Sequence, residues 1–215
     1  SKPFVDIWKE LRGVPVLELE TKTHRNSTSI QKVKTFTPPS DSKEFIFSQL
    51  SKNIENACIK ARRHRLAAAE VTIFLRTQDF RHIGLKVRFS SATAFSNKII
   101  HACEKLFKEC FNSRELYRAT GVVLSQLTDD VNAQLDLFGT HLEVEKLTRL
   151  YKGVDALSEK FGKHTVFAGS SFQAQMWSAH EGGRGDTPLR HQDLFSGETS
   201  RQRLAIPMLA FGEAV

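Results

Sequence analysis

The sequence predicts an α+β fold, a four-stranded sheet with two helices on one face, followed by a C-terminal extension that is helical or irregular. Two observations predict this fold. Residues 70–78 and 84–91 alternate apolar and polar side chains, which is the period of half-buried strands. A helical stripe lies on either side of this strand pair, with one further strand outside each stripe, so the order is β-α-β-β-α-β over roughly residues 28–128.

The residues before this unit are expected to lead into it. Residues 4–20 indicate the end of a helix, a stop at Gly13 and an extended apolar segment. Residues 21–28 are polar and basic without periodicity, which is typical of a linker. The first strand is expected at 29–36, and Thr37-Pro38-Pro39 should end it, because proline has no N–H to donate to a sheet.

The first helix is expected to follow Ser42, whose hydroxyl group can cap it. Apolar residues recur at helical spacing from Ile46 to Ala61, and the cations of "KARRHRL" suit the C-terminal end of a helix. Ser96 and Asn97 are expected to open the second helix. The last strand is expected at 115–127.

The C-terminal extension divides into three parts. Residues 142–163 are amphipathic and predict a helix that ends at Gly162. Residues 164–169 are expected to form a short strand. From Ser170 the chain becomes polar, with a loop at 180–188, and residues 203–211 could dock back onto the domain.

The open face of the predicted sheet carries positive charge. On the two clearest strands the outward positions hold Arg76, Lys86, Arg88 and Phe74, with Thr and Ser between them and no acid expected among them. An antiparallel sheet is normally polar on its solvent side, so an ordinary solvated face is the alternative interpretation. The sign of the charge favours a polyanionic partner, as does the net charge of +7 with a pI of about 9.4.

Several classes of protein find little support. Three cysteines make no disulfide framework and are expected to be buried thiols, and the eight histidines show no zinc-ligand spacing. No apolar run approaches the ~20 residues that cross a bilayer, and no signal peptide is visible. No nucleotide-binding motif and no catalytic constellation was found, so a free-standing enzyme has no recognisable site. The chain starts at Ser1, which indicates either an excised fragment or processing.

The peptide "QLDLF" follows the last predicted strand, in a polar stretch that resembles neither a strand nor a helix. It consists of Gln134, Leu135, Asp136, Leu137 and Phe138. Exposed, such a peptide can insert its leucines and phenylalanine into a groove on a partner while the glutamine bonds at the rim. The alternative is a loop or strand tucked onto its own domain.

Three pieces in this order resemble Y-family translesion DNA polymerases, the UmuC/DinB-like (ImpB/MucB/SamB) family. "IWKELRGVPVLELE" resembles the end of the thumb, and "SIQKVKTFT", the βαββαβ unit and "RATGVVLSQL" resemble the little-finger domain. "QLDLF" falls where these enzymes carry a sliding-clamp-binding peptide, and residues 155–171 are similar to the C-terminal region of the UmuC-like branch. The resemblance implies the division thumb end and linker 1–27, little finger 28–128, clamp-binding linker 129–141 and C-terminal extension 142–215.

The resemblance implies sequence-independent binding of primer–template DNA and tethering to the bacterial sliding clamp, within an error-prone polymerase of DNA repair and the SOS response. The candidate DNA-binding residues are Lys32, Lys34, Arg76, Lys86, Arg88 and Arg118, with Lys22 and Arg25 in the linker as weaker candidates. Strand faces rest on alternation alone, so a bulge would exchange Lys32 and Lys34 with Gln31 and Val33.

The family's palm, which holds two Mg²⁺ ions, has no counterpart here, so the chain is expected to need no cofactor and to be inactive as a polymerase alone. A bacterial cytoplasmic, nucleoid-associated location without a membrane partner is expected, and a recombinase filament is a further candidate partner by analogy. The alternative function is a protein–protein adaptor whose basic sheet is incidental.

Overall fold

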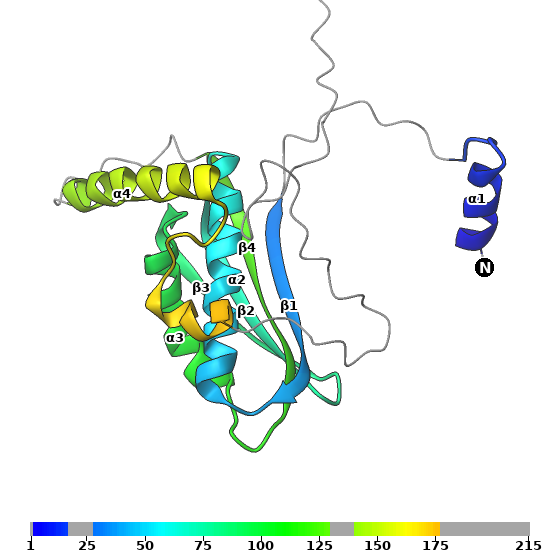
Figure 1. Ribbon diagram of the computed structural model, residues 1–215, viewed down its shortest axis with the longest axis horizontal. Coiled ribbons are helices and arrows are strands. Elements are labelled where there is room, and N and C mark those ends of the chain that lie inside the picture. The colour runs from blue at the N-terminus through cyan, green and yellow to red at the C-terminus, as the bar shows by residue number, and fades with distance from the viewer. Residues whose placement is uncertain (1, 17–27, 130–139, 177–215) are drawn as a thin grey trace, which may run out of the picture.

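The computed structural model describes residues 2–16, 28–129 and 140–176 (Figure 1). Its elements in chain order are α1 (Lys2–Leu11), β1 (Ser29–Ser40), α2 (Lys43–Arg63), β2 (Leu66–Thr77), β3 (His82–Thr93), α3 (Ser96–Cys110), β4 (Tyr117–Asp129), α4 (Thr140–Phe161), the 3₁₀ turn η2 (Gly169–Ser171) and α5 (Phe172–Met176). The β-α-β-β-α-β order predicted from the sequence is therefore confirmed.

The sheet has the strand order β1-β4-β2-β3, and every neighbouring pair is antiparallel. β4 and β2 occupy the centre, while β1 and β3 form the edges. α2 and α3 pack against one face, and none of the helices that the structure describes covers the other face (Figure 1). This is the α+β architecture of the little-finger domain that the sequence resembles.

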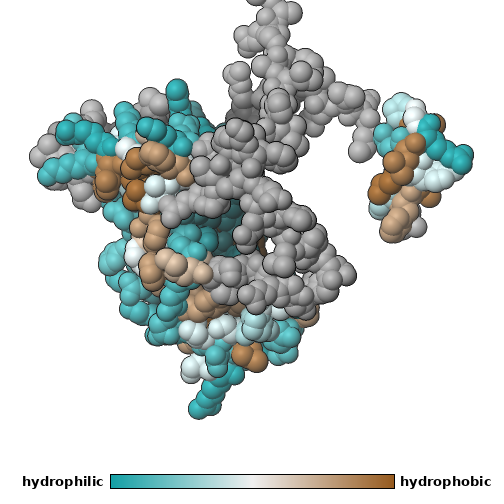
Figure 2. Space-filling model, in the orientation of Figure 1, coloured by the Kyte–Doolittle hydropathy of each residue, from teal (hydrophilic) through white to brown (hydrophobic). Residues whose placement is uncertain are grey.

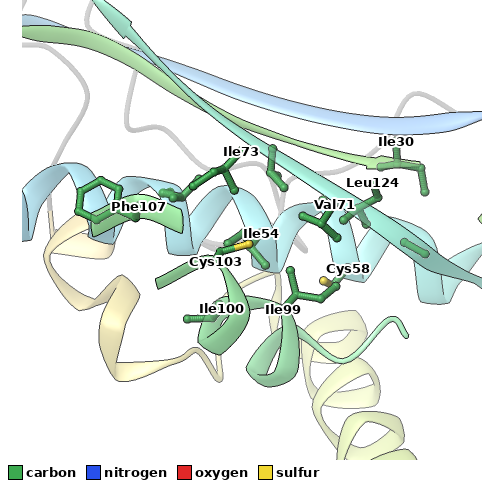
Figure 3. Close-up of a cluster of buried hydrophobic side chains, with 14 of the residues drawn as sticks. Ile30, Ile54, Cys58, Val71, Ile73, Ile99, Ile100, Cys103, Phe107 and Leu124 are labelled. Carbon is green, nitrogen blue, oxygen red and sulfur yellow. The ribbon is translucent and has the colours of Figure 1, made fainter. Parts of the chain in front are cut away.

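The hydrophobic core lies between the sheet and the two helices (Figure 3). Ile54 and Cys58 of α2 and Ile99 of α3 meet Val71 and Ile73 of β2, and all five are fully buried. The three cysteines are free thiols within this layer, as the sequence predicted. Burial raises the pKa of Cys58 to about 12 and that of Cys103 to about 12, because a thiolate is poorly solvated there.

The two core helices begin differently. Ser42 caps α2 as predicted, because its Oγ accepts a hydrogen bond from the backbone N–H of Phe45 at 3.3 Å. α3 begins at Ser96, but its N-cap is Phe95, which makes no capping hydrogen bond with its side chain. The hydroxyl of Ser96 is instead 2.9 Å from that of Tyr151 in α4. The start of α3 thus serves as a docking point for the C-terminal extension.

β1 is longer than predicted. It continues through Pro38 and Pro39 to Ser40, so the expectation that these prolines end the strand was wrong. The pairing with β4 shifts register between Thr35 and Ser40, and β1 is an edge strand. Proline is tolerated at such an edge, because one side of the strand needs no ladder partner.

α1 presents its apolar side chains to solvent. Phe4, Ile7, Trp8 and Leu11 are each more than half exposed, and they form the hydrophobic stripe that Figure 2 shows on this helix. Gly13 follows with a φ of 78°, a conformation in which glycine ends a helix without strain, as the sequence predicted.

The C-terminal extension packs on the helical layer. α4 ends before Gly162, which has a φ of 96°, and the predicted helix at 142–163 is confirmed within a few residues. The predicted strand at 164–169 was wrong: the segment is irregular and leads into η2 and α5, which contact α2. Residues 177–215, including the predicted loop at 180–188 and the segment 203–211, lie outside the described residues, and the predicted domain division stays a prediction.

Polar contacts fasten the extension to α2. Glu55, a buried residue of α2, accepts hydrogen bonds from the N–H of Ala168 at 2.6 Å and the hydroxyl of Ser171 at 2.7 Å. Further along, the Lys52 ammonium donates to the carbonyl of Ala174, and the N–H of Ala174 donates to Ser48 Oγ, both at 2.8 Å. The backbone of the extension is thus satisfied by side chains of α2 rather than by a sheet.

None of the helices that the structure describes has the length and apolar character needed to cross a membrane.

Candidate nucleic-acid interface

The open face consists of the outward side chains of all four strands, and the pairing register places them in rows across the sheet. One row joins Gln31, Val123, Thr72 and Lys86, the next joins Val33, Gly121, Phe74 and Gly84, and a third joins Thr35, Ala119, Arg76 and His82. Glu70 lies between Ser125 and Arg88 in a fourth row. The face is therefore a continuous surface of mixed polar and apolar side chains.

Arg76, Lys86 and Arg88 lie on this face, where alternation in β2 and β3 predicted them. The side chains of Lys86 and Arg88 are 68% and 66% exposed. They come from the edge strand β3, whose inward residues Leu85 and Val87 pack on the core. Their charged ends are therefore accessible to a partner that lies across the sheet.

One carboxylate interrupts this positive surface. Glu70 Oε2 lies 3.5 Å from Lys86 Nζ and 3.4 Å from Arg88 Nη2, and its other oxygen is 3.3 Å from Ser125 Oγ. The expectation that no acid lies among the outward positions was wrong, because Glu70 is the first outward residue of β2. Both ion pairs join exposed cations, and such pairs contribute little to stability.

An aromatic ring occupies the centre of the face. Phe74 lies over Gly121 of β4, so a Cβ at position 121 would overlap the end of the ring. On the other side its ring is 6.0 Å from that of His82. Glycine at 121 therefore allows the Phe74 ring to reach over the neighbouring strand β4.

Arg118 reaches the same face through an irregularity in β4. Arg76 pairs with Ala119 but Thr77 pairs with Tyr117, so Arg118 is the extra residue of a β-bulge. Its guanidinium lies 4.4 Å from the ring centre of Phe80, and that of Arg76 lies 5.8 Å away. Phe80 sits in the β2–β3 turn with a φ of 64°, rare for an aromatic residue, and is 62% exposed.

Phe80 was not singled out from the sequence. Its segment, "TQDFRH", carries no apolar alternation, and positive φ is expected at Gly, Asn or Asp rather than at Phe. The Nε atoms of both neighbouring arginines, Arg76 and Arg118, are buried without a hydrogen-bond partner. This corner therefore holds two cations and an aromatic ring together.

Lys32 and Lys34 do not lie on the open face. In β1 the residues Ile30, Lys32, Lys34 and Phe36 are less exposed than their neighbours and share the side of the helices. The outward positions belong to Gln31, Val33 and Thr35. A shift of the strand by one residue reverses the face of every side chain, so the lysines and these residues have exchanged sides relative to the prediction. The predicted placement of these two lysines on the open face was wrong.

The remaining predicted site residues fall outside the described residues. These are Lys22 and Arg25 of the linker and the peptide Gln134, Leu135, Asp136, Leu137 and Phe138. Within residues 2–16, 28–129 and 140–176, no three His, Cys, Asp or Glu side chains gather as they would around a metal ion. What the described face offers is charge: four cations, Arg76, Lys86, Arg88 and Arg118, around one carboxylate, which suits the electrostatic holding of a polyanion.

Comparison with known families gives this surface a context. Residues 27–137, just over half of the chain, match the model of the impB/mucB/samB family C-terminal domain. The chain belongs to the impB/mucB/samB family. This confirms the resemblance to the C-terminal region of Y-family polymerases. The matched range begins two residues before β1 and ends at Leu137.

Two curated proteins to which this chain is similar are named DNA polymerase IV. That of Pelotomaculum thermopropionicum is 27% identical over 112 residues, covering 52% of this chain and 27% of the relative. That of Clostridium acetobutylicum is 24% identical over 165 residues, covering 74% of this chain and 40% of the relative. The chain thus spans between about a quarter and two fifths of the length of these relatives.

Among solved structures, a complex of a β-clamp processivity factor with the little finger domain of PolIV is similar at 17% identity and a TM-score of 0.37. The similarity covers 51% of this chain and 98% of that one.

Proposed function

We propose that this domain holds primer–template DNA against its open sheet face, without reading the base sequence, as the C-terminal part of an error-prone translesion polymerase. The observation that carries the proposal is the set of four cations, Arg76, Lys86, Arg88 and Arg118, on one uncovered face with a single carboxylate among them. The relatives named as DNA polymerases IV support the choice of DNA as the polyanion.

The chemistry of this face suits backbone binding. Lysine and arginine side chains replace condensed counterions at phosphates, and such contacts position a protein on DNA without specifying sequence. A polymerase that meets damaged templates at any position requires this kind of grip. In this role the domain holds the substrate, and we expect no polymerase activity from these residues alone.

The test is a titration of blunt duplex DNA with the full chain at several salt concentrations. The variant Lys86→Gln/Arg88→Gln should bind more weakly at low salt and flatten the log–log salt slope by about 2, since each lost contact removes about 0.9. The matched control, Lys105→Gln/Lys108→Gln, makes the same charge change on α3, on the helical side of the domain. If both variants lose the same DNA affinity, or if the affinity does not change with salt concentration, the adaptor alternative is favoured.

We propose further that the peptide Gln134 to Phe138 tethers the domain to a sliding clamp. The support is its sequence and its position directly after β4, since the peptide itself lies outside the described residues. Gln134→Ala and Phe138→Ala should each weaken clamp binding at least about tenfold if they are anchor residues of a small interface. Asn132→Ala, just before the peptide, is the control, and clamp affinity unchanged in both anchor variants would remove the proposal.

A further inference from the structure

A second basic surface lies on the opposite side of the sheet from the open face, along the edge formed by β1 and α2. We call it the β1–α2 edge. Its residues are Lys32 and Lys34 of β1, Lys52 and Arg63 of α2, and Lys163 just after α4. They come from three separate parts of the chain, and none was expected there from the sequence.

The fold brings these five cations together. β1 is an edge strand against which α2 packs, so the inward-leaning side chains of Lys32 and Lys34 emerge beside this helix. Lys52 and Arg63 are eleven residues apart in α2, about three turns, which places them on the same side of the helix. Lys163 follows directly on Gly162, where the positive φ turns the chain back onto α2.

Electrostatic coupling shows how close the groups lie. The pKa of Lys163 is lowered by burial, then by the neighbouring charges of Arg63 and Lys32. The pKa of Lys52 is lowered by burial and then by Lys34, against a smaller opposite effect of Glu55. Like charges are thus crowded along this edge, at a cost that a bound polyanion would relieve.

Glu55 is an acidic residue beside this edge, and it is buried rather than exposed to a partner in solvent. Glu55 is 6% exposed, and its two oxygens accept from Ala168 and Ser171 of the extension. His164 lies 3.8 Å from this carboxylate, but burial, then Lys52 and Lys163, lowers its pKa to about 4, so it is neutral at pH 7. Lys52 keeps a contact with the carbonyl of Ala174 and still contributes its charge.

We propose that the β1–α2 edge binds the phosphate backbone of single-stranded nucleic acid that continues from a duplex held on the open face. The cations of the open face lie on β4, β2 and β3, and those of the β1–α2 edge lie on the other side of the sheet beside β1, so one molecule that touches both must turn around β1. A duplex, with a persistence length of about 150 base pairs, does not make such a turn cheaply, whereas a single strand does. This inference rests on the proposed DNA-holding function.

The experiment compares two probes with the full chain by fluorescence anisotropy: a blunt duplex, and the same duplex with a single-stranded arm of about 12 nucleotides, within the usual range of single-strand sites. For wild type, the arm should raise the affinity. The variant Lys32→Gln/Arg63→Gln/Lys163→Gln should lose this gain and flatten the salt slope on the armed probe by about 2, since a single-strand contact is worth about 0.7. Its binding to the blunt duplex should stay as in wild type.

Three outcomes would overturn the inference: no gain from the arm in wild type, an unchanged gain in the triple variant, or equal weakening on both probes. The variant Lys86→Gln/Arg88→Gln separates this inference from the proposed function, because it should weaken both probes. If wild type binds the blunt duplex and Lys86→Gln/Arg88→Gln does not weaken it, the proposed function fails. The triple variant and wild type should have the same melting temperature. If the triple variant melts at a lower temperature, the three single variants are tested on both probes instead.

Discussion

At the scale of single residues, the contact between Phe74 and Gly121 shapes the surface of the open face. The Phe74 ring reaches over β4 only because position 121 has no side chain. A ring that leans onto the neighbouring strand obstructs less of the approach to the cations on this face. The site therefore depends on an uncharged pair of residues as well as on its arginines and lysines.

Gly121→Ala should destabilise the domain by about 1–3 kcal/mol, the usual cost of overpacking, because the new methyl group displaces the Phe74 ring. Urea unfolding followed by circular dichroism measures this cost. The double variant Gly121→Ala/Phe74→Ala should recover part of it, since the ring that clashes is gone. A Gly121→Ala chain as stable as wild type would contradict the close approach of ring and backbone.

The same scale shows where alternation predicts side-chain direction and where it misleads. In β2 the aliphatic residues Val71, Ile73 and Leu75 alternate and face the core, as Ile83, Leu85 and Val87 do in β3, so the outward cations were placed correctly. In β1, Val33 faces solvent while Lys32 and Lys34 lie on the helical side. Lysine can lay its aliphatic stem along an apolar surface and still keep its ammonium in water, so at an edge strand charge is a poor guide to direction.

At the scale of elements, α4 is joined to the core by a small set of buried and half-buried contacts. The Tyr151 hydroxyl lies 2.9 Å from Ser96 Oγ and accepts from the N–H of Asn97 at 3.0 Å. Arg62 forms a two-pronged contact with Asp155, with both N–O distances at 2.7 Å, and its guanidinium lies 4.5 Å from the Tyr151 ring centre. The helix is therefore oriented by specific polar geometry rather than by apolar burial alone.

Tyr151→Phe should reduce the free energy of unfolding by about 1–2 kcal/mol, because Ser96 and Asn97 lose a buried partner. Hydrogen exchange should accelerate in α4 before it changes in β2 and β4. Leu150→Ala alters the neighbouring residue, which is 57% exposed, and should have a much smaller effect. Exchange that rises equally throughout the domain would argue against separate docking of α4.

The docking of residues 164–174 on α2 should weaken in acid. Burial, then the nearby Lys52 and Lys163, lowers the pKa of His164 to about 4 from 6.5. Because His164 is harder to protonate in the folded than in the unfolded state, protons favour the unfolded state. The stability contributed by His164 is therefore fully present above pH 6.5 and is lost as the pH falls from 6.5 towards 4. Glu55 acts in the opposite sense, because burial raises its pKa and protonation relieves the cost of the buried charge.

The difference between wild type and His164→Gln isolates the histidine. Gln keeps a polar group near Asn56, whose Oδ1 lies 3.2 Å from His164 Nε2, but does not titrate. The stability of wild type relative to the variant should fall by up to about 3 kcal/mol between pH 7 and pH 4, as measured by urea unfolding at each pH. A difference that does not change with pH would show that His164 titrates normally in the fold.

The sequence predicted correctly those elements that depend on residues close together in the chain. The amphipathic period of α4 and the stops at Gly13 and Gly162 all appear in the structure. The strand expected at 164–169 does not, because its backbone donors are taken by a side chain far away in sequence, as Ala168 shows with Glu55. A short apolar run cannot reveal a distant carboxylate.

At the scale of the whole molecule, the order of elements was enough to predict the layer arrangement, since a β-α-β-β-α-β chain has few ways to cover one face of a sheet. The net charge of the open face was not predictable in the same way. Glu70 lies within β2, and its two ion pairs depend on the register with β3. Whether a surface binds a polyanion depends on such pairs as well as on the number of its cations.

Glu70→Gln should therefore strengthen duplex binding, by about fivefold at low salt, because Lys86 and Arg88 no longer share their charge with a carboxylate. The gain should shrink as salt is raised. Glu104→Gln is the control, because it frees Lys108 by the same change of charge on α3, and it should leave the affinity nearly unchanged. A similar gain in both variants would mean that only the total charge of the chain matters.

The composition of β1 also affects whether the sheet edges of two molecules can pair with each other. A sheet edge offers a row of N–H and C=O groups with which a second sheet can pair, and long apolar edges aggregate for this reason. β1 contains Pro38 and Pro39 just before its last residue, and these have no N–H to offer. It also carries Lys32 and Lys34 along its length. The opposite edge, β3, bears Lys86 and Arg88. The charges proposed to grip nucleic acid therefore also disfavour the pairing of either strand edge with a neighbouring sheet.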